Sequence, residues 1–336
     1  MQERDVLEPG KGEVLVRVEA CGVCGTDIHI YDGESGSAEV HPPVVIGHEF
    51  SGVVEEVGEG VRNLIPGDHV TIDPNRYCGI CRFCRTGKKN LCERMSAVGV
   101  NRDGGFAEKC LVPEEHCFQI DSSVPFEEAA MVEPLACCIH GIDRAGIRTG
   151  DSVCVIGGGS IGLMMVQLAR ISGASAVILS EPRELQRHTA LQLGASLAVD
   201  PTSEDMDTRI RDTLGSDGVD VVIECVGRVE ATEQALKVAG RGARVLLFSV
   251  PRPGATVGLD LLSVFQKELS ILGSFVNPDT HLRAVKLIES RQVSMAPLIT
   301  HKFPLERLED AIAMQTSAES IKVIVEPSRA NSRMRT

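Results

Sequence analysis

The chain has 336 residues, of which 43% are hydrophobic and 3% aromatic, and its formal net charge at pH 7 is −13. An acidic chain without tryptophan is unsuited to binding nucleic acid or an anionic membrane surface. No apolar run approaches the roughly 20 residues that span a bilayer, and the polar N-terminal residues do not resemble a signal peptide. We therefore expect a cytoplasmic protein of two domains, with neither nucleic acid nor membrane as a partner.

The first predicted element is a strand over residues 13–19, in which valines alternate with charged residues. Short apolar runs at residues 44–46, 52–57 and 68–72 follow, separated by glycine and proline. Many short strands with turns between them predict a small, irregular β domain.

The stretch after the first strand contains Cys24, followed further on by His48 and Glu49. A thiol, an imidazole and a carboxylate are the ligand types of zinc. Three protein ligands leave a fourth position open, and an open position distinguishes a catalytic zinc from a structural one. Each residue alone is compatible with a buried thiol or a solvated loop, but the combination predicts a catalytic zinc site.

Four further cysteines follow with the spacing C-x2-C-x2-C-x7-C, at Cys78, Cys81, Cys84 and Cys92. Such short spacings return the chain to one centre, which predicts a structural zinc held by four thiolates. An iron–sulfur cluster is the alternative, but ferredoxin spacings differ from this one. In a chain of this size without an export signal, metal ligation and buried thiols explain the cysteines better than disulfides do.

A helix is predicted over residues 129–142, and it carries Glu133 among apolar neighbours. An exposed carboxylate is not expected in that setting. Glu133 either caps the start of a helix or faces the metal, and the spacing does not choose between these roles.

From residue 151 the pattern changes to alternating strands and helices. A buried strand at residues 152–156 is followed at once by G-x-G-x-x-G and a helical pattern, which is the order required of a dinucleotide-binding turn. The glycines let the backbone approach a pyrophosphate, and the helix N-terminus presents N–H groups to it. The candidate cofactor contacts in this turn are Gly157, Gly159, Ser160, Ile161 and Gly162.

The alternation continues, with helical stretches between the strands. Further strands are expected at residues 176–179, 197–199, 219–224, 243–248 and 271–273. Strands joined by crossover helices form a doubly wound parallel sheet, so the fold class is α/β. The last elements are helices over residues 280–290 and 305–314 and a strand over residues 321–325, and we expect residues 295–325 to return to the first domain.

Glu181 ends the second strand of this sheet, where an acidic side chain accepts hydrogen bonds from the adenosine ribose and repels a 2′-phosphate. This position favours NAD over NADP. Arg183 and Arg187 lie close by and could offset the repulsion, which makes Arg183 a further candidate cofactor contact. For both arginines a solvated helix face is the simpler expectation.

Together these motifs resemble the zinc-dependent medium-chain alcohol dehydrogenases of the sorbitol (polyol) and threonine dehydrogenase branch. The resemblance covers nearly the whole chain and is carried by the four-cysteine lobe and by residues 24–29, 47–49, 104–108, 133–135 and 157–162. It implies a GroES-like β catalytic domain, formed by residues 1–136 and 276–336, and a Rossmann NAD-binding domain over residues 137–275. It also implies an active site in the cleft between the domains, and a homodimer or homotetramer.

The resemblance assigns roles by position. Cys24 and His48 would bind the catalytic zinc, with Glu49 or Glu133 as the third protein ligand. Thr26 and His29 match a relay that carries the alcohol proton to solvent. Two zinc ions per chain are expected, because the four cysteines match the structural zinc. Family members also have a strand pair ahead of residue 13, so we expect an open edge there or a misassigned start.

The implied reaction is hydride transfer from a secondary alcohol, a polyol such as sorbitol or xylitol, to NAD+. L-threonine 3-dehydrogenase or 2,3-butanediol dehydrogenase activity is the alternative. Residues 24–31 resemble the threonine enzymes, and residues 133–141 resemble the polyol enzymes. A non-catalytic zinc-ribbon protein is a remote alternative, against which the acidic charge and the second zinc constellation weigh.

Overall fold

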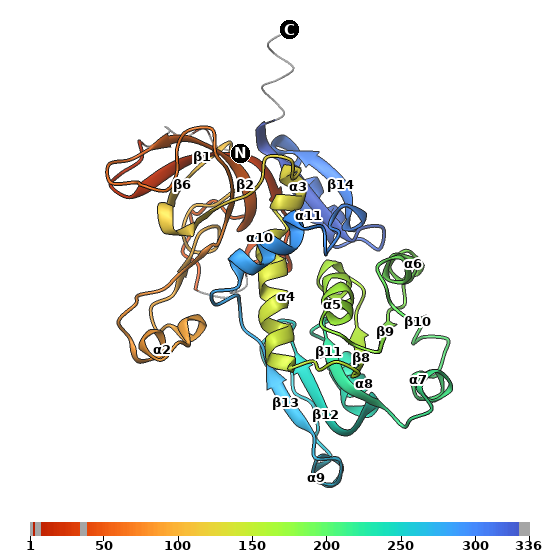
Figure 1. Cartoon of the computed structure of the whole chain (residues 1–336). Coiled ribbons are helices and arrows are strands. Elements are labelled where there is room, and N and C mark those ends of the chain that lie inside the picture. The colour runs from red at the N-terminus through yellow and green to blue at the C-terminus, as the bar shows by residue number, and fades with distance from the viewer. Residues whose placement is uncertain (1–2, 4–7, 34–38, 329–336) are drawn as a thin grey trace. The chain divides into compact units, whose positions relative to one another are not determined.

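Two compact units make up the chain, which is drawn in Figure 1. The computed structural model describes residue 3, residues 8–33 and residues 39–328. Residues 1–136 and 277–336 form the first unit, and residues 137–276 form the second. Helix α4 (Val132–Ala145) runs across the first boundary. Within the described residues, no helix is long and apolar enough to cross a membrane.

The first unit is built on a seven-stranded sheet of mixed direction. Its strands run in the order β14–β15–β1–β2–β3–β7, and β6 also pairs with β1. β1 has strand partners on both sides. The strands are β1 (Glu13–Gly22), β2 (Glu49–Val57), β3 (His69–Ile72), β6 (Lys109–Pro113), β7 (Cys117–Gln119), β14 (Ile299–Pro304) and β15 (Lys322–Glu326).

Period-two alternation explains which face of β1 packs into the core. Its valines Val14, Val16 and Val18 are fully buried and pack in one cluster with Phe50 of β2. Burying a valine or phenylalanine side chain stabilises a fold by about 1.5–3 kcal/mol. The alternating residues therefore fix both the strand and the face that it turns inward.

Short elements complete the first unit. The helices are α1 (Gly25–Tyr31), α2 (Arg82–Arg85), α3 (Phe126–Ala129), α10 (His281–Glu289) and α11 (Leu308–Gln315), with 3-10 turns at Lys89–Leu91, Glu114–His116, Ala296–Leu298 and Leu305–Arg307, and a small hairpin of β4 (Asn75–Arg76) and β5 (Ser96–Ala97). The strand predicted at residues 44–46 is wrong. Val45 and Ile46 lie in a loop, and their carbonyl oxygens accept hydrogen bonds from Gly104 and Phe106. The helix predicted over residues 129–142 is divided between α3 and α4.

The second unit confirms the predicted parallel sheet. Its six strands run in the order β10–β9–β8–β11–β12–β13, and every neighbouring pair is parallel. The strands are β8 (Ser152–Ile156), β9 (Ala176–Ser180), β10 (Leu197–Val199), β11 (Val219–Glu224), β12 (Ala239–Leu247) and β13 (Ser270–Gly273), and the helices are α5 (Ser160–Ile171), α6 (Glu184–Gln192), α7 (Met206–Leu214), α8 (Val229–Val238) and α9 (Leu261–Lys267). α7 and α9 lie between successive strands, where helical stretches are expected.

The strand order reverses between β8 and β11, and this reversal positions the candidate cofactor site. Ile156 of β8 is in register with Ser180 of β9 and with Glu224 of β11. The carboxyl ends of the three strands therefore lie level with one another. Ligands of open parallel sheets bind at such a reversal, beyond the carboxyl ends of the strands.

The turn between β8 and α5 depends on two glycines. Gly157 has a φ of +96°, in the left-handed region that favours glycine. A Cβ atom on Gly162 would lie 1.8 Å from the carbonyl oxygen of Gly157. A side chain at position 162 would therefore push the turn open. Gly159, the N-cap of α5, has open space where a Cβ atom would stand.

We expect Gly162→Ala to lower the free energy of unfolding by about 1–3 kcal/mol, because the added methyl group meets backbone that cannot move aside. Gly159→Ser is the matched control within the same turn. It adds an ordinary cap residue in open space and should change stability by no more than about 0.5 kcal/mol. Denaturant unfolding of both variants measures the difference, and equal stabilities would contradict this account of the turn.

Candidate metal centre

Two groups of side chains in the described residues could each hold a metal ion. One group is Cys24, His48 and Glu49, and the other is the four-cysteine set predicted from the spacing. Within each group the possible ligand atoms all lie within 4.8 Å of one another. The structure therefore gathers both of the sequence-predicted ligand sets, with Glu49 in the first.

Antiparallel pairing of β1 with β2 brings the first group together. Gly22, the last residue of β1, is in register with Glu49, the first residue of β2. Cys24 stands two positions beyond Gly22, as the N-cap of α1. His48 and Glu49 are buried, and Cys24 is partly exposed. Residues that are distant in the sequence thus become neighbours because two strands share one register.

A buried carboxylate that the motif analysis missed, that of Asp27, holds these ends in place. Asp27 has no solvent exposure, and its carboxylate accepts hydrogen bonds from the backbone N–H of Cys24 at 2.9 Å and of Gly47 at 3.2 Å. Its Oδ1 atom also lies 3.3 Å from Nδ1 of His48, without hydrogen-bond geometry. An acidic residue three positions after a helix cap commonly reaches back to the cap, but this signal requires the helix to be predicted first.

The charges around His48 favour the contact with Asp27. Burial lowers the pKa of the His48 imidazole, but the charges of Asp27 and Cys24 outweigh burial and raise that pKa well above its usual value. With Nδ1 turned to a carboxylate, Nε2 is the ring nitrogen left for a metal. A carboxylate on the far ring nitrogen is the usual way in which a protein orients a histidine ligand.

The donor set of this cluster fits zinc. It combines one thiol, one imidazole and one carboxylate, and three protein ligands leave one position for a substrate. Burial of Glu49 would be costly for an unpaired charge, but its carboxylate forms an ion pair with Lys322.

Three further predicted residues, Thr26, His29 and Glu133, lie outside this group of ligand atoms. Thr26 and His29 are both half-buried and lie one turn apart on α1. Glu133, the second residue of α4, is buried but does not belong to the group of three whose ligand atoms meet. Its role as a ligand or a neighbour of the metal stays a prediction.

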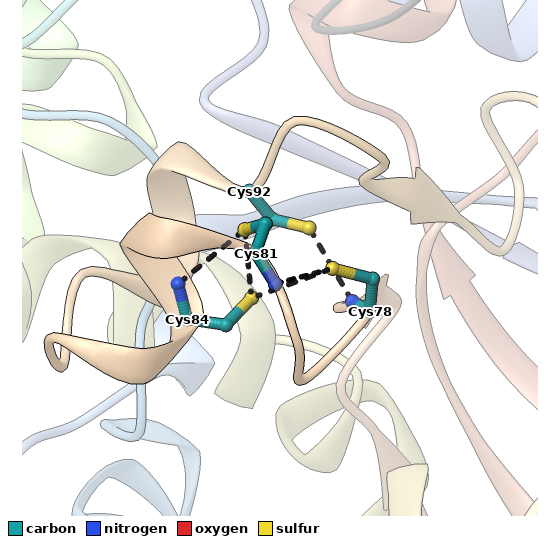
Figure 2. A group of neighbouring side chains, drawn as sticks. All are labelled: Cys78, Cys81, Cys84 and Cys92. Atoms are coloured by element: carbon teal, nitrogen blue, oxygen red, sulfur yellow. Dashed lines mark hydrogen bonds between the residues drawn. The ribbon is translucent and has the colours of Figure 1, made fainter.

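The four-cysteine lobe is shown in Figure 2, where the four sulfur atoms converge. Sγ of Cys84 lies 3.5 Å from Sγ of Cys81 and 4.0 Å from Sγ of Cys78. Backbone N–H groups of Ile80 and Cys81 lower the pKa of the Cys78 thiol to about 6. The thiolate is the form that binds a metal. All twelve cysteines are free thiols, which agrees with metal ligation in place of disulfides.

In the second unit, Glu181 organises the candidate cofactor turn. Its buried carboxylate accepts a hydrogen bond from the N–H of Gly158 at 2.6 Å through one oxygen. The other oxygen accepts from the backbone N–H and from Nε of Arg183, at 2.9 and 3.0 Å. Gly157, Gly158 and Gly159 lead into Ser160 and Ile161, the first two residues of α5. The turn, the helix N-terminus and the acidic residue thus stand together.

The solvated helix face expected for Arg187 is wrong. The side chain of Arg187 is only 22% exposed, and it forms an ion pair with Asp200 at 3.5 Å. It also donates hydrogen bonds to the carbonyl oxygens of Glu181 and Pro182, at 2.9 and 2.5 Å. Arg187 therefore binds the backbone that follows β9, and Arg183 is bound to the Glu181 carboxylate.

Both units match known protein families. The family model described as the alcohol dehydrogenase GroES-like domain matches residues 10–122, and the one described as zinc-binding dehydrogenase matches residues 160–290. An L-threonine 3-dehydrogenase of Pyrococcus horikoshii is 35% identical over 326 residues, which cover 96% of this chain and 93% of the relative. A sorbitol dehydrogenase of Halalkalibacterium halodurans is 35% identical over 333 residues, which cover 97% of this chain and 95% of the relative.

A solved structure is similar over the same length. A zinc-binding dehydrogenase of Sinorhizobium meliloti, bound to NADP, has a TM-score of 0.91 and 42% identity, and the match covers 96% of this chain and 94% of that one. A GroES-like unit and a parallel dinucleotide-binding sheet define the class as medium-chain dehydrogenases. The chain belongs to the zinc-dependent alcohol dehydrogenase family, as the motifs predict, and it is an oxidoreductase.

We expect Asp27→Asn to lower the free energy of unfolding by about 1–3 kcal/mol, because two buried N–H groups lose a charged acceptor. The amount of zinc bound at the cluster of Cys24, His48 and Glu49 should also fall, while the amount bound at the four-cysteine lobe should not change. Elemental analysis and denaturant unfolding measure the two effects. Asp279→Asn, which removes an exposed ion pair with Lys89, is the control and should change stability by less than about 1 kcal/mol. Unchanged zinc content in Asp27→Asn would contradict the assigned role.

Proposed function

We propose that this chain oxidises a secondary alcohol of a small polyol, such as sorbitol or xylitol, and transfers the hydride to NAD+. The cluster of Cys24, His48 and Glu49 carries the proposal, because it gathers the ligand types of a catalytic zinc within 4.8 Å of one another. We propose zinc at this cluster and a second zinc at the four-cysteine lobe. Glu133 remains a candidate neighbour of the first zinc.

Bound zinc would supply a Lewis acid that lowers the pKa of the substrate alcohol, and bound NAD+ would accept the hydride. We assign Thr26, two positions from Cys24, as the group that takes the alcohol proton. His29 lies one helical turn further along α1 and is half-buried, and we assign its imidazole to pass that proton to solvent. The two residues thus form a relay from the buried cluster to the outside of the unit.

Cofactor binding is proposed for the turn at Gly157 to Gly162. The N–H groups at the start of α5 would bind the pyrophosphate, and Gly159 leaves the space open in front of them. Glu181 stands at the end of β9, where the ribose of the adenosine half is expected.

The substrate has one specific alternative. Relatives of equal identity include both a threonine and a sorbitol dehydrogenase, so identity does not separate the two activities. Residues 133–141, which begin with Glu133, resemble the polyol enzymes, and this resemblance favours a polyol. L-threonine and 2,3-butanediol are the alternative substrates.

Cys24→Ser and His48→Ala test the function. Each should lower the rate of NAD+ reduction by at least about 10³-fold, because Lewis-acid stabilisation is worth several kcal/mol. Cys117→Ser, outside both clusters, is the matched control and should retain activity. The wild type should give its highest kcat/KM with sorbitol or xylitol among sorbitol, xylitol, threonine and 2,3-butanediol. Full turnover by a zinc-free variant would refute the mechanism, and a preference for threonine would establish the alternative substrate.

Arg183 tests the cofactor. We propose NAD, with NADP bound more weakly, because the Glu181 carboxylate repels a 2′-phosphate and the paired Arg183 only partly offsets it. Arg183→Ala should therefore raise the Kd of NADP+ by about 10-fold or more, the worth of a charge-assisted hydrogen bond, and leave that of NAD+ within about threefold. Arg209→Ala, a partly exposed arginine on α7, is the control. Titration monitored by fluorescence or heat gives each Kd, and tighter wild-type binding of NADP+ than of NAD+ would overturn the cofactor assignment.

A homodimer or homotetramer is proposed with the enzyme, in the cytoplasm. Support for self-association comes from α9, where Leu261, Leu262 and Phe265 are 75%, 61% and 78% exposed. Apolar side chains grouped on a surface are typical of protein interfaces. The strand β13, at the edge of the parallel sheet, begins three residues after the last residue of α9.

A further inference from the structure

A lysine is buried beside the candidate metal centre. Lys322, the first residue of β15, is 2% exposed, and it is among the largest fully buried side chains of the described residues. Burial lowers the pKa of its ammonium group, but the Glu49 carboxylate outweighs burial and raises that pKa above the usual value. The ammonium group lies against the oppositely charged Glu49 carboxylate. Burying a charge costs several kcal/mol unless its partners are close and well placed.

The partners of Lys322 are two parts of the same cluster. Its ammonium group forms an ion pair with Oε2 of Glu49, and it donates a hydrogen bond of 2.9 Å to the carbonyl oxygen of Val23. Val23 immediately precedes Cys24, so one side chain contacts the backbone next to one ligand and the carboxylate of another. These contacts join residues that are 299 and 273 positions apart in the sequence.

The space around this ion pair is shaped for it. A Cβ atom on Gly22 would lie 2.4 Å from Oε2 of Glu49 and 2.8 Å from Cε of Lys322. A side chain at position 22 would therefore displace the ends of both side chains from these positions. The strand register brings the same residues together, because Gly22 pairs with Glu49 on one side and with Ile324 of β15 on the other.

We propose that Lys322 is a positioning residue of the metal centre. It holds one oxygen of the Glu49 carboxylate, so that the other oxygen is presented to the ion beside Cys24 and His48. The inference rests on the proposed zinc at this cluster.

The test uses Co²⁺ in place of zinc, in the full chain, with affinity measured by competition against a chelator. A site with one thiolate and a site with four thiolates absorb differently, so both can be followed in one sample. In Lys322→Met, Co²⁺ affinity at the one-thiolate site should fall about 10–100-fold, the usual effect of losing a residue that orients a metal ligand. The four-thiolate site should be unchanged.

Two variants separate positioning from mere stability. Lys322→Arg keeps the charge and should recover most of the lost affinity. Lys302→Met removes another lysine of the same sheet, which pairs with Glu326 and Glu127, and it should leave the one-thiolate site unchanged. Unchanged Co²⁺ affinity in Lys322→Met, with only thermal stability lowered, would overturn the inference.

If Lys322→Met does not fold, a comparison of a Glu49 variant with the corresponding double variant tests the proposal. Replacing both members of a buried ion pair by neutral residues is often tolerated, whereas breaking it is not. Glu49→Gln and Glu49→Gln/Lys322→Met should then bind Co²⁺ within about threefold of each other, well inside the 10–100-fold range of an orienting residue. A further tenfold loss in the double variant would show that Lys322 does not act through Glu49 and would overturn the proposal. A wild type without a one-thiolate Co²⁺ site would refute the proposed function as well.

Discussion

The geometry of the candidate metal centre depends on two buried charges that do not belong to its ligand group. Asp27 joins the backbone at Cys24 to the backbone at Gly47, and Lys322 joins Val23 to the Glu49 carboxylate. Each charge has its partners among the residues that carry or adjoin a ligand. Buried ion pairs contribute little to net stability, but they penalise every arrangement in which they are not formed. The contacts of Asp27 and Lys322 therefore restrict the strand ends to a single arrangement.

At the candidate cofactor site, buried carboxylates also bind backbone groups of the neighbouring loops. The Glu181 carboxylate binds the N–H of Gly158 and the side chain of Arg183, so the acidic residue proposed to bind the ribose also holds the glycine turn. Glu224, at the end of the adjacent strand β11, likewise accepts hydrogen bonds from Val226 and Gly227. At both sites buried carboxylates satisfy backbone groups of loops that have no ladder partner.

The sequence predicts what depends on local spacing. The four-cysteine lobe, the glycine turn and the strands of the parallel sheet follow from residues close together in the chain, and their bounds agree to within a few residues. The helix at Gly25–Tyr31 and the role of Lys322 do not follow. A helix of two turns has too little periodicity to detect. Lys322 reads as an ordinary strand-start lysine, because its partner Glu49 is 273 positions away and only the sheet brings the two together.

The first unit is assembled from two stretches of chain, with the whole second unit inserted between them. On a translating ribosome, residues 137–276 emerge as one continuous segment, whereas β1 must wait for β15 near the end of the chain. Contacts across such long separations form late. A nascent chain that stops before residue 322 has its complete cysteine lobe but lacks the cation for Glu49. Completion of this candidate metal centre therefore waits for the synthesis of Lys322.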